Sequence, residues 1–465
     1  YSAYQYQGDL AAVTGDFNGD GVPDMVKASF FYQIQFEPTF SFKKIDFVQF
    51  FPSLGDGQFG KPSAPIFVKT DATEFADEIT TLVAGDFNRD GKLDVFTTHN
   101  SGTGSILLGR GDGTFETEVD SDGQFLAPTA FTVSAYDYLG IHLPTFTATV
   151  ADFNRDSILD VATANASASE VAIWVGQGDG TFAASVPILI PGLPPPRNIQ
   201  AGDFNGDGWI DLATVNEVED GDGGTDVALL INQGGGTFHL RSERPAVRDL
   251  PITFGKAYIV AADFDGSGRE DLAYGNLDGS ISLLRGEADG TFRPEERLQF
   301  VDGSSLAREV DSLVALDFNK DGHMDLAAAG VGSHLYVFYG NGDGTFQRTD
   351  KAYVVAQNGY PTSLAAADLN GDGATDVILT SSTSNETAIF LNHGDGTFID
   401  TRPSNTRIND TSSSYALSAT ATARCSRPGR SRTPSRCRRA AASAPSSATP
   451  GRWTPTRSPS WARSG

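Results

Sequence analysis

The stretch Asp16-Phe-Asn-Gly-Asp-Gly-Val-Pro-Asp24 decides the fold, because it recurs six more times along the chain. The later copies begin at Asp86, Asp152, Asp203, Asp263, Asp317 and Asp368. A second motif, Gly55-Asp-Gly-Gln-Phe59 in the first copy, follows each loop and ends at Phe115, Phe182, Phe238, Phe292, Phe346 and Phe398 in the others. Seven pairs of motifs in one order identify an internal repeat, with 51 to 70 residues between successive starts.

Each repeat is predicted to contain four short strands. The first precedes the Asp loop, the second follows it, the third precedes the Gly-Asp-Gly turn, and the fourth starts at the Phe. Four-stranded units of this length predict an all-β, seven-bladed β-propeller of antiparallel blades over residues 1–404; a linear solenoid is the alternative. Ring closure stays open: Tyr1–Gln7 could add a strand to the last blade, or residues 397–402 could complete it alone.

Residues 405–465 are predicted to be a low-complexity tail rich in Arg, Ser, Pro and Ala. From Ala423 onward the tail has ten arginines and no acidic residue, and it carries both cysteines, Cys425 and Cys437. Such a segment cannot bury a core. It is interpreted either as a basic, disordered arm or as GC-rich DNA translated out of frame, and neither cysteine is given a function.

Charge and hydropathy exclude several functions. The net charge is −25, and setting the ten tail arginines aside leaves −35 for residues 1–422, which disfavours nucleic acid and anionic membranes as partners. No apolar run is long enough to span a bilayer, and no signal peptide is visible at Tyr1, so the sequence is interpreted as a processed or trimmed chain. A large secreted domain without disulfides must be held by its core, by ring closure or by metal.

The Asp loops have the donor pattern of a hard cation. In the first loop, side chains at positions 1, 3, 5 and 9 and the backbone carbonyl of position 7 can converge on one point, and no soft ligand is present. Three acids per loop repel one another unless a cation lies among them, which favours Ca²⁺ over a purely turn-forming role, with up to seven ions. The expected side-chain ligands are Asp16, Asn18, Asp20 and Asp24; Asp86, Asn88, Asp90 and Asp94; Asp152, Asn154, Asp156 and Asp160; Asp203, Asn205, Asp207 and Asp211; Asp263, Asp265, Ser267 and Asp271; Asp317, Asn319, Asp321 and Asp325; and Asp368, Asn370, Asp372 and Asp376.

The carbonyl at position 7 is the fifth expected ligand. It belongs to Val22, Lys92, Ile158, Trp209, Arg269, His323 and Ala374. The third site is expected to be weak because Ser157 replaces the turn glycine, and the fifth because Ser267 replaces an aspartate. The acids of the Gly-Asp-Gly turns are interpreted as structural, because the fourth turn has Gly235 in that place.

The two motifs together resemble the FG-GAP or VCBS-type repeat, over roughly residues 9–402. That family includes the propeller of integrin α chains, certain fungal lectins and many bacterial surface proteins. The resemblance implies calcium within the blades and an extracellular or cell-surface location. It does not fix a ligand, since the repeat serves adhesion, sugar binding and, in some lyases, catalysis.

The meander order places the Asp loops and the Gly-Asp-Gly turns on one face, and the length variation on the other. The segments 27–52, 120–146 and 216–225 carry that variation, and the first is rich in phenylalanine. They are predicted to bind the ligand; the alternative for the first is a lengthened hairpin that covers the blade edge.

The sequence therefore predicts a recognition or adhesion module for a glycan or extracellular protein, expected to be a monomer. A calcium-dependent polysaccharide lyase and a purely structural scaffold are the alternatives. The chain has six histidines and no His-Glu-x-x-His pattern, so no catalytic residue is assigned.

Overall fold

The computed structural model describes residues 2–400 apart from 36–40, 69–77, 100–102, 120–124, 128, 133–145, 167–168, 184–186, 191–194, 218–224, 244–257, 277–278, 294–295, 300–307, 332–333, 349–352, 355–360 and 382–386. Contacts divide the chain into Tyr1–Ser412 and Ser413–Gly465. The expected start of the tail at residue 405, together with Cys425 and Cys437, lies outside the described residues. No helix among the described residues is long and apolar enough to cross a membrane.

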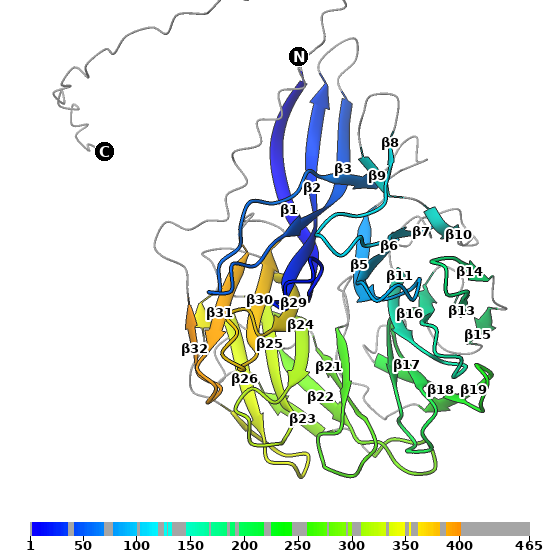
Figure 1. Ribbon diagram of the computed structural model, residues 1–465. Coiled ribbons are helices and arrows are strands. Elements are labelled where there is room, and N and C mark those ends of the chain that lie inside the picture. The colour runs from blue at the N-terminus through cyan, green and yellow to red at the C-terminus, as the bar shows by residue number, and fades with distance from the viewer. Residues whose placement is uncertain are drawn as a thin grey trace, which may run out of the picture. The chain divides into compact units, whose positions relative to one another are not determined.

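The described elements are all strands, gathered into seven antiparallel sheets that form a seven-bladed propeller (Figure 1). The first three blades are β1 (Ser2–Gly15), β2 (Asp24–Gln35), β3 (Ser41–Phe51) and β4 (Ile66–Val68); β5 (Ile79–Gly85), β6 (Asp94–His99), β7 (Thr103–Leu107) and β10 (Thr129–Thr132); and β11 (Phe146–Ala151), β12 (Asp160–Asn165), β13 (Glu170–Gly176), β14 (Phe182–Ala183) and β15 (Ile188–Leu189).

The remaining four blades follow the same order, from the innermost strand outward. They are β16 (Pro196–Gly202), β17 (Asp211–Glu217), β18 (Thr225–Asn232) and β19 (Phe238–Glu243); β20 (Ile259–Ala262), β21 (Asp271–Gly275), β22 (Ser280–Leu284) and β23 (Glu296–Gln299); β24 (Arg308–Leu316), β25 (Asp325–Val331), β26 (His334–Gly340), β27 (Phe346–Arg348) and β28 (Tyr353–Val354); and β29 (Pro361–Ala367), β30 (Asp376–Ser381), β31 (Ala388–Asn392) and β32 (Phe398–Asp400). Each innermost strand contacts the next one, and β29 contacts β1, so the ring is closed. The prediction of a propeller is confirmed, and the solenoid is excluded.

The outermost strands depart from the predicted pattern in three blades. The fourth strand starts at the motif Phe in blades three, four, six and seven. In blades one, two and five that Phe forms only an isolated bridge, and the outer strand follows later. Blade one is further extended by β9 (Phe125–Ala127), which pairs in parallel with β4, and by β8 (Glu118–Val119), so part of the second repeat completes the first blade.

The aromatic insertion of the first repeat is a lengthened hairpin. Gly15 pairs with Asp24 at the loop end of β1, and Ser2 pairs with Gln35 at the other end, so the extra length runs away from the Asp loop. Figure 1 shows β1, β2 and β3 reaching well beyond the neighbouring blades. Phe30, Phe47, Phe50 and Phe51 are at most 7% exposed, so these four rings are not available to stack on a ligand. Phe50 packs in a cluster shared with the second blade, and Phe51 in one shared with the last blade. The rest of the insertion's tip lies outside the described side chains.

Neighbouring blades are joined by aromatic pairs. In six of the seven Asp loops, the Phe at position 2 meets the motif Phe of the next blade, with ring centroids 5.5–6.0 Å apart and steep interplanar angles. Such edge-to-face pairs contribute about 0.5–1.5 kcal/mol each beyond burial. At the closing seam Leu369 takes the place of the Phe and packs in one cluster with Phe59. The motif Phe is therefore a structural residue.

The closing seam also holds a buried ion pair. Lys27 of β2 lies 3.1 Å from Asp9 of β1, and both side chains are less than 10% exposed. Ser29 and Thr387 donate hydrogen bonds to the same carboxylate, and Thr387 belongs to the last blade. Blade seven has its own four strands, so the ring is closed by side-chain contacts and not by a strand from Tyr1–Gln7.

Removing one partner of this pair should weaken the ring strongly. Lys27→Met leaves Asp9 buried without its cation, which typically costs about 3–5 kcal/mol of unfolding free energy. The double variant Asp9→Asn/Lys27→Met removes both charges and should recover much of that loss. Urea unfolding of the three proteins checks this; equal instability of the single and double variants would contradict a buried-charge effect.

Deleting the tail should leave the propeller intact. Because β32 ends at Asp400 and completes the last blade, a chain ending at Asn405 should keep the melting temperature and calcium content of the full chain. Loss of soluble protein on truncation would show instead that the tail covers the last blade.

Candidate metal centres and a pocket beside one of them

The seven Asp loops share one hydrogen-bond scheme. In the first loop, Asp16 accepts hydrogen bonds from the amides of Gly19, Asp20 and Gly21. The side chain at position 3 accepts from the amide of position 5, and position 5 accepts from the amide of position 7. The bonds from the amides of positions 5 and 6 to position 1 recur in the other six loops, so all seven share one scheme. The bond from the amide of position 4 recurs in the fourth and seventh loops.

The aspartate at position 9 is the buried member of each set. Asp24, Asp94, Asp160, Asp211, Asp271, Asp325 and Asp376 are at most 1% exposed. One oxygen accepts from the amide at the head of the Gly-Asp-Gly turn, and in six loops the other accepts from the amide of position 2. This carboxylate therefore ties the loop to the turn of its own blade, which confirms that both connections lie on one face.

Burial opposes the negative charge of these carboxylates. It raises the pKa of six of them to about 6, and carboxylates at positions 1 and 5 add to the rise in most of the loops. Burial raises the pKa of Asp211 to about 7. Its Oδ2 is a buried oxygen without the amide bond that the other six loops form. A cation among the three acids of a loop would offset this cost.

The donor set fits a hard divalent cation. All side-chain donors are carboxylate, amide or hydroxyl oxygens, which Ca²⁺ prefers. In the fifth loop, oxygens of Asp263, Asp265 and Asp271 lie within 4.8 Å of one another. In the first loop the amide nitrogen of Asn18 is 2.9 Å from Asp20, so positions 3 and 5 already meet. Among the described residues, only the fifth loop brings three such acidic oxygens this close together. The ligand sets and cation binding stay predictions.

The third loop keeps the common conformation at a cost. Ser157 has φ +66° and still donates from its amide to Asp152 at 2.7 Å. Arg155, at φ +61°, is a second non-glycine residue in the left-handed region. Each such residue costs roughly 1 kcal/mol or more. The Arg155 guanidinium lies 3.9 Å from the Trp209 ring of the next blade and donates to the carbonyl of Gly208.

The turn aspartates are structural. Asp112, Asp179, Asp289, Asp343 and Asp395 each accept from the hydroxyl and the amide of the threonine two residues later. The threonine hydroxyl holds the pKa of these five exposed carboxyls below the usual value. In the fourth turn Gly235 removes the acid, so Thr237 has no such partner within the described turn.

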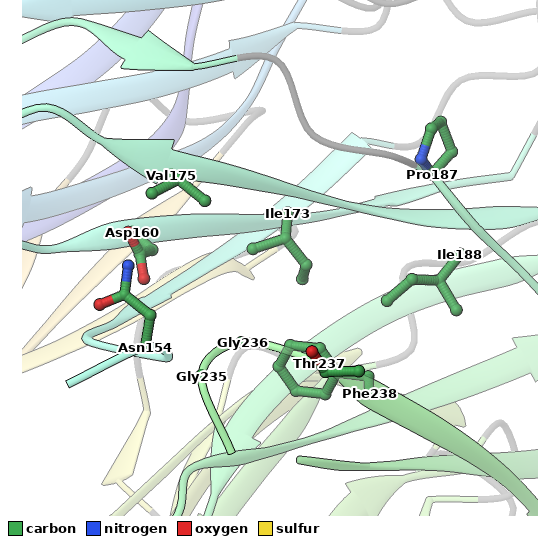
Figure 2. A pocket seen from close by; sticks show the side chains of 10 residues that line it. All are labelled: Asn154, Asp160, Ile173, Val175, Pro187, Ile188, Gly235, Gly236, Thr237 and Phe238. Atoms are coloured by element: carbon green, nitrogen blue, oxygen red, sulfur yellow. The ribbon is translucent and has the colours of Figure 1, made fainter. Parts of the chain in front are cut away.

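A pocket of about 520 Å³ lies at the seam between blades three and four (Figure 2). Ile173, Val175, Pro187 and Ile188 of blade three form one wall, and the fourth turn, ending at Phe238, faces them. Asn154 and Asp160 of the third Asp loop close one end. Sequence reasoning missed this pocket, and the only sequence signal was the absent acid at Gly235. The ligand face predicted on the segments 27–52, 120–146 and 216–225 lies largely outside the described side chains and stays a prediction.

Comparison with known proteins agrees with this architecture. The model of the FG-GAP-like repeat matches residues 86–140, 149–214, 263–328, 317–379 and 368–421, together more than half of the chain. No curated protein sequence gives a match.

Among solved structures, an Agrocybe aegerita lectin described as recognising non-reducing terminal N-acetylglucosamine is 20% identical, with 83% of this chain and 92% of the lectin covered and a TM-score of 0.52. BBS1N in complex with ARL6DN is 11% identical, with 82% and 96% covered and a TM-score of 0.47. The rhamnogalacturonan lyase YesW is 12% identical, with 85% and 76% covered and a TM-score of 0.39. At these identities the likeness to the lectin concerns the fold alone.

The raised pKa values of the position 9 aspartates predict that, without calcium, folding stability depends on pH in an unusual way. Unfolded aspartates titrate near 3.9, so the buried groups add stability when protonated and lose it as pH rises through about 6 to 7. In chelator, the melting temperature should therefore rise as pH falls from 8 to 5. In excess calcium the trend should reverse, because protons then compete with the cation.

Calorimetry at several pH values checks this. Asp211→Asn, which cannot titrate, should show a smaller rise in chelator than the parent protein. A melting temperature that falls steadily from pH 8 to 5 in chelator would contradict the assignment.

Proposed function

Because the chain belongs to the family of FG-GAP-like repeat proteins, we propose that it is a calcium-binding recognition module that works outside the cell and binds a glycan or protein ligand. The observation that supports calcium most directly is the buried aspartate at position 9 of all seven loops. Seven carboxylates withdrawn from water, each beside two further acidic or polar oxygen donors, are compensated best by a divalent cation.

In each loop, the ligands of the cation are the side chains at positions 1, 3, 5 and 9 and the carbonyl at position 7. The bound ion supplies positive charge that offsets the repulsion among the acids. Since position 9 also joins the loop to the turn, cation binding stabilises the face that carries both connections. An extracellular location fits this role, because millimolar calcium can fill sites of modest affinity.

A binding function is favoured over a lyase by the chemistry of the seam pocket. A lyase needs a base beside a bound uronate, and Asp160 is the one titratable group among the residues that line this pocket. Its oxygens already accept amide hydrogen bonds from Phe153 and Gly176. A monomer is proposed because ring closure needs no second chain.

Calcium should control stability. Extracellular calcium modules bind in the range of about 0.1–1 mM, and an ion at roughly twenty times its dissociation constant adds about 2 kcal/mol per site. Seven sites then add on the order of 10 kcal/mol, comparable to the stability of a whole domain. We expect a large drop in melting temperature in chelator, restored by calcium and poorly by magnesium.

Matched variants test the assignment of the loops. Asp207→Ala should lower the calcium stoichiometry by one and lower the melting temperature in calcium, whereas Asp56→Ala, in an exposed turn, should change neither. Metal content by elemental analysis and melting curves give the result. An unchanged melt of metal-free protein would refute the calcium proposal. Glycan arrays and incubation with pectin-like polymers, monitored for unsaturated products, separate a binder from a lyase.

A further inference from the structure

The seam between blades three and four differs from the other six in how it is filled. In six seams, a Cβ built on the last glycine of the turn would come within 3.2 Å of a side chain of the preceding blade. Those side chains are Leu391, Phe50, Leu108, Ile231, Arg285 and Tyr339. At Gly236 the nearest atom is the Asn154 Cβ, at 3.6 Å. The shorter Val175 lies where Leu108 and Ile231 lie in their blades, and the pocket is the space that a longer side chain fills elsewhere.

The fourth turn contributes a polar group to one edge of the pocket. Gly234, Gly235 and Gly236 all have positive φ, so the turn runs differently from the Gly-Asp-Gly turns. Because Gly235 replaces the aspartate, the Thr237 hydroxyl faces the pocket without the partner that five other threonines have. The remaining wall is apolar, formed by Ile173, Val175, Pro187, Ile188 and Phe238.

From this geometry we propose that the seam pocket anchors an apolar side chain of a basic partner polypeptide, and that its occupancy is coupled to the cation of the third Asp loop. The inference rests on the proposed function as a binding module. The oxygens of Asp160 already accept amide hydrogen bonds, which leaves the Asn154 amide and the Thr237 hydroxyl as the other polar side-chain groups of the lining. These are too few partners for the hydroxyls of a sugar ring, whereas aliphatic walls suit a leucine-like group. Arg155 is engaged with Trp209 across the seam, and the surrounding domain is strongly acidic. Residues 1–422 carry −35, which the +14 charge of seven Ca²⁺ ions reduces only to −21, and this charge favours lysine or arginine beside the anchor.

The coupling follows from a shared wall. Asn154 and Asp160 line the pocket and are also expected ligands of the third cation. A side chain bound against these two residues changes the binding free energy of the cation. By thermodynamic linkage, the bound cation changes the binding free energy of that side chain by the same amount. The other six loops do not line this pocket, so the coupling belongs to the third loop.

Isoleucine methyl spectra of the full chain in calcium provide the test, with Ile173 and Ile188 as reporters. The probes are capped Lys-Leu-Lys, Lys-Ser-Lys and Glu-Leu-Glu tripeptides. We expect Lys-Leu-Lys to shift both methyl signals and to bind at least tenfold more tightly than either other peptide. Val175→Leu, which copies Leu108, should abolish these shifts, whereas Ile231→Leu in the next seam should keep them.

Equal shifts in Val175→Leu, equal binding of Lys-Ser-Lys, or no shift at millimolar Lys-Leu-Lys would overturn the pocket assignment. Shifts by methyl glucoside, blocked by Val175→Leu, would assign the pocket to sugars and overturn the peptide class. If Val175→Leu does not fold, Val175→Ile, which copies Ile231, replaces it, with the same expected loss.

The coupling has its own pair of variants. Asp152→Asn in the third loop should weaken Lys-Leu-Lys binding severalfold, and Asp317→Asn in the sixth loop should not; equal effects would refute the coupling. If the peptide and coupling experiments fail while calcium still raises the melting temperature, the pocket proposal alone is rejected. If calcium has no effect on the melting temperature, the proposed function itself is rejected.

Discussion

The carboxylate at position 9 of each Asp loop is the constraint on which the rest of the structure depends. It is the one charged group of the loop that folding removes from water, and in six of the seven loops two backbone amides from different connections converge on it. Through it, the start of the second strand, the loop and the turn after the third strand are fixed relative to one another. The less buried acids at positions 1 and 5 can then gather around one point, because the backbone that carries them is already held.

The blades depend on one another through the same segments. The position 2 residue that donates its amide to this carboxylate also sends its side chain into the next blade. There it meets the motif Phe in an edge-to-face pair, and the carbonyl of Phe17 accepts a hydrogen bond from Gly113. One nine-residue loop therefore organises both its own sheet and the seam beside it. The seam between blades three and four shows that this arrangement tolerates local change. There the short Val175 and the missing acid at Gly235 leave a pocket. The third Asp loop beside it keeps the common conformation, with Arg155 and Ser157 in the left-handed region.

The sequence predicts the fold and the loops because both are repeated. Seven copies of the Asp pattern reveal the unit, and glycine at the turn positions fixes the local conformation. Structural features that occur only once in the chain are harder to predict from the sequence. The parallel pairing of β9 with β4 joins two repeats, and no pattern within either one indicates it. The pocket arises from the difference between Val175 and its longer counterparts, which is visible only once the seams are superposed. The phenylalanines of the insertion could line a binding surface or a blade interior, and only packing decides that Phe30, Phe47, Phe50 and Phe51 are buried.

The closure of the ring has an evolutionary meaning. Many closed rings need one sheet built from both chain ends, which makes the first and last units unlike the others. Here blades four to seven each consist of one contiguous stretch that begins at its innermost strand and ends at its outermost one. In these four blades the boundary of the sequence repeat therefore coincides with the boundary of the folded unit. A duplication or deletion of one repeat inserts or removes a whole blade, so the number of blades can change by recombination without the loss of any half-built sheet.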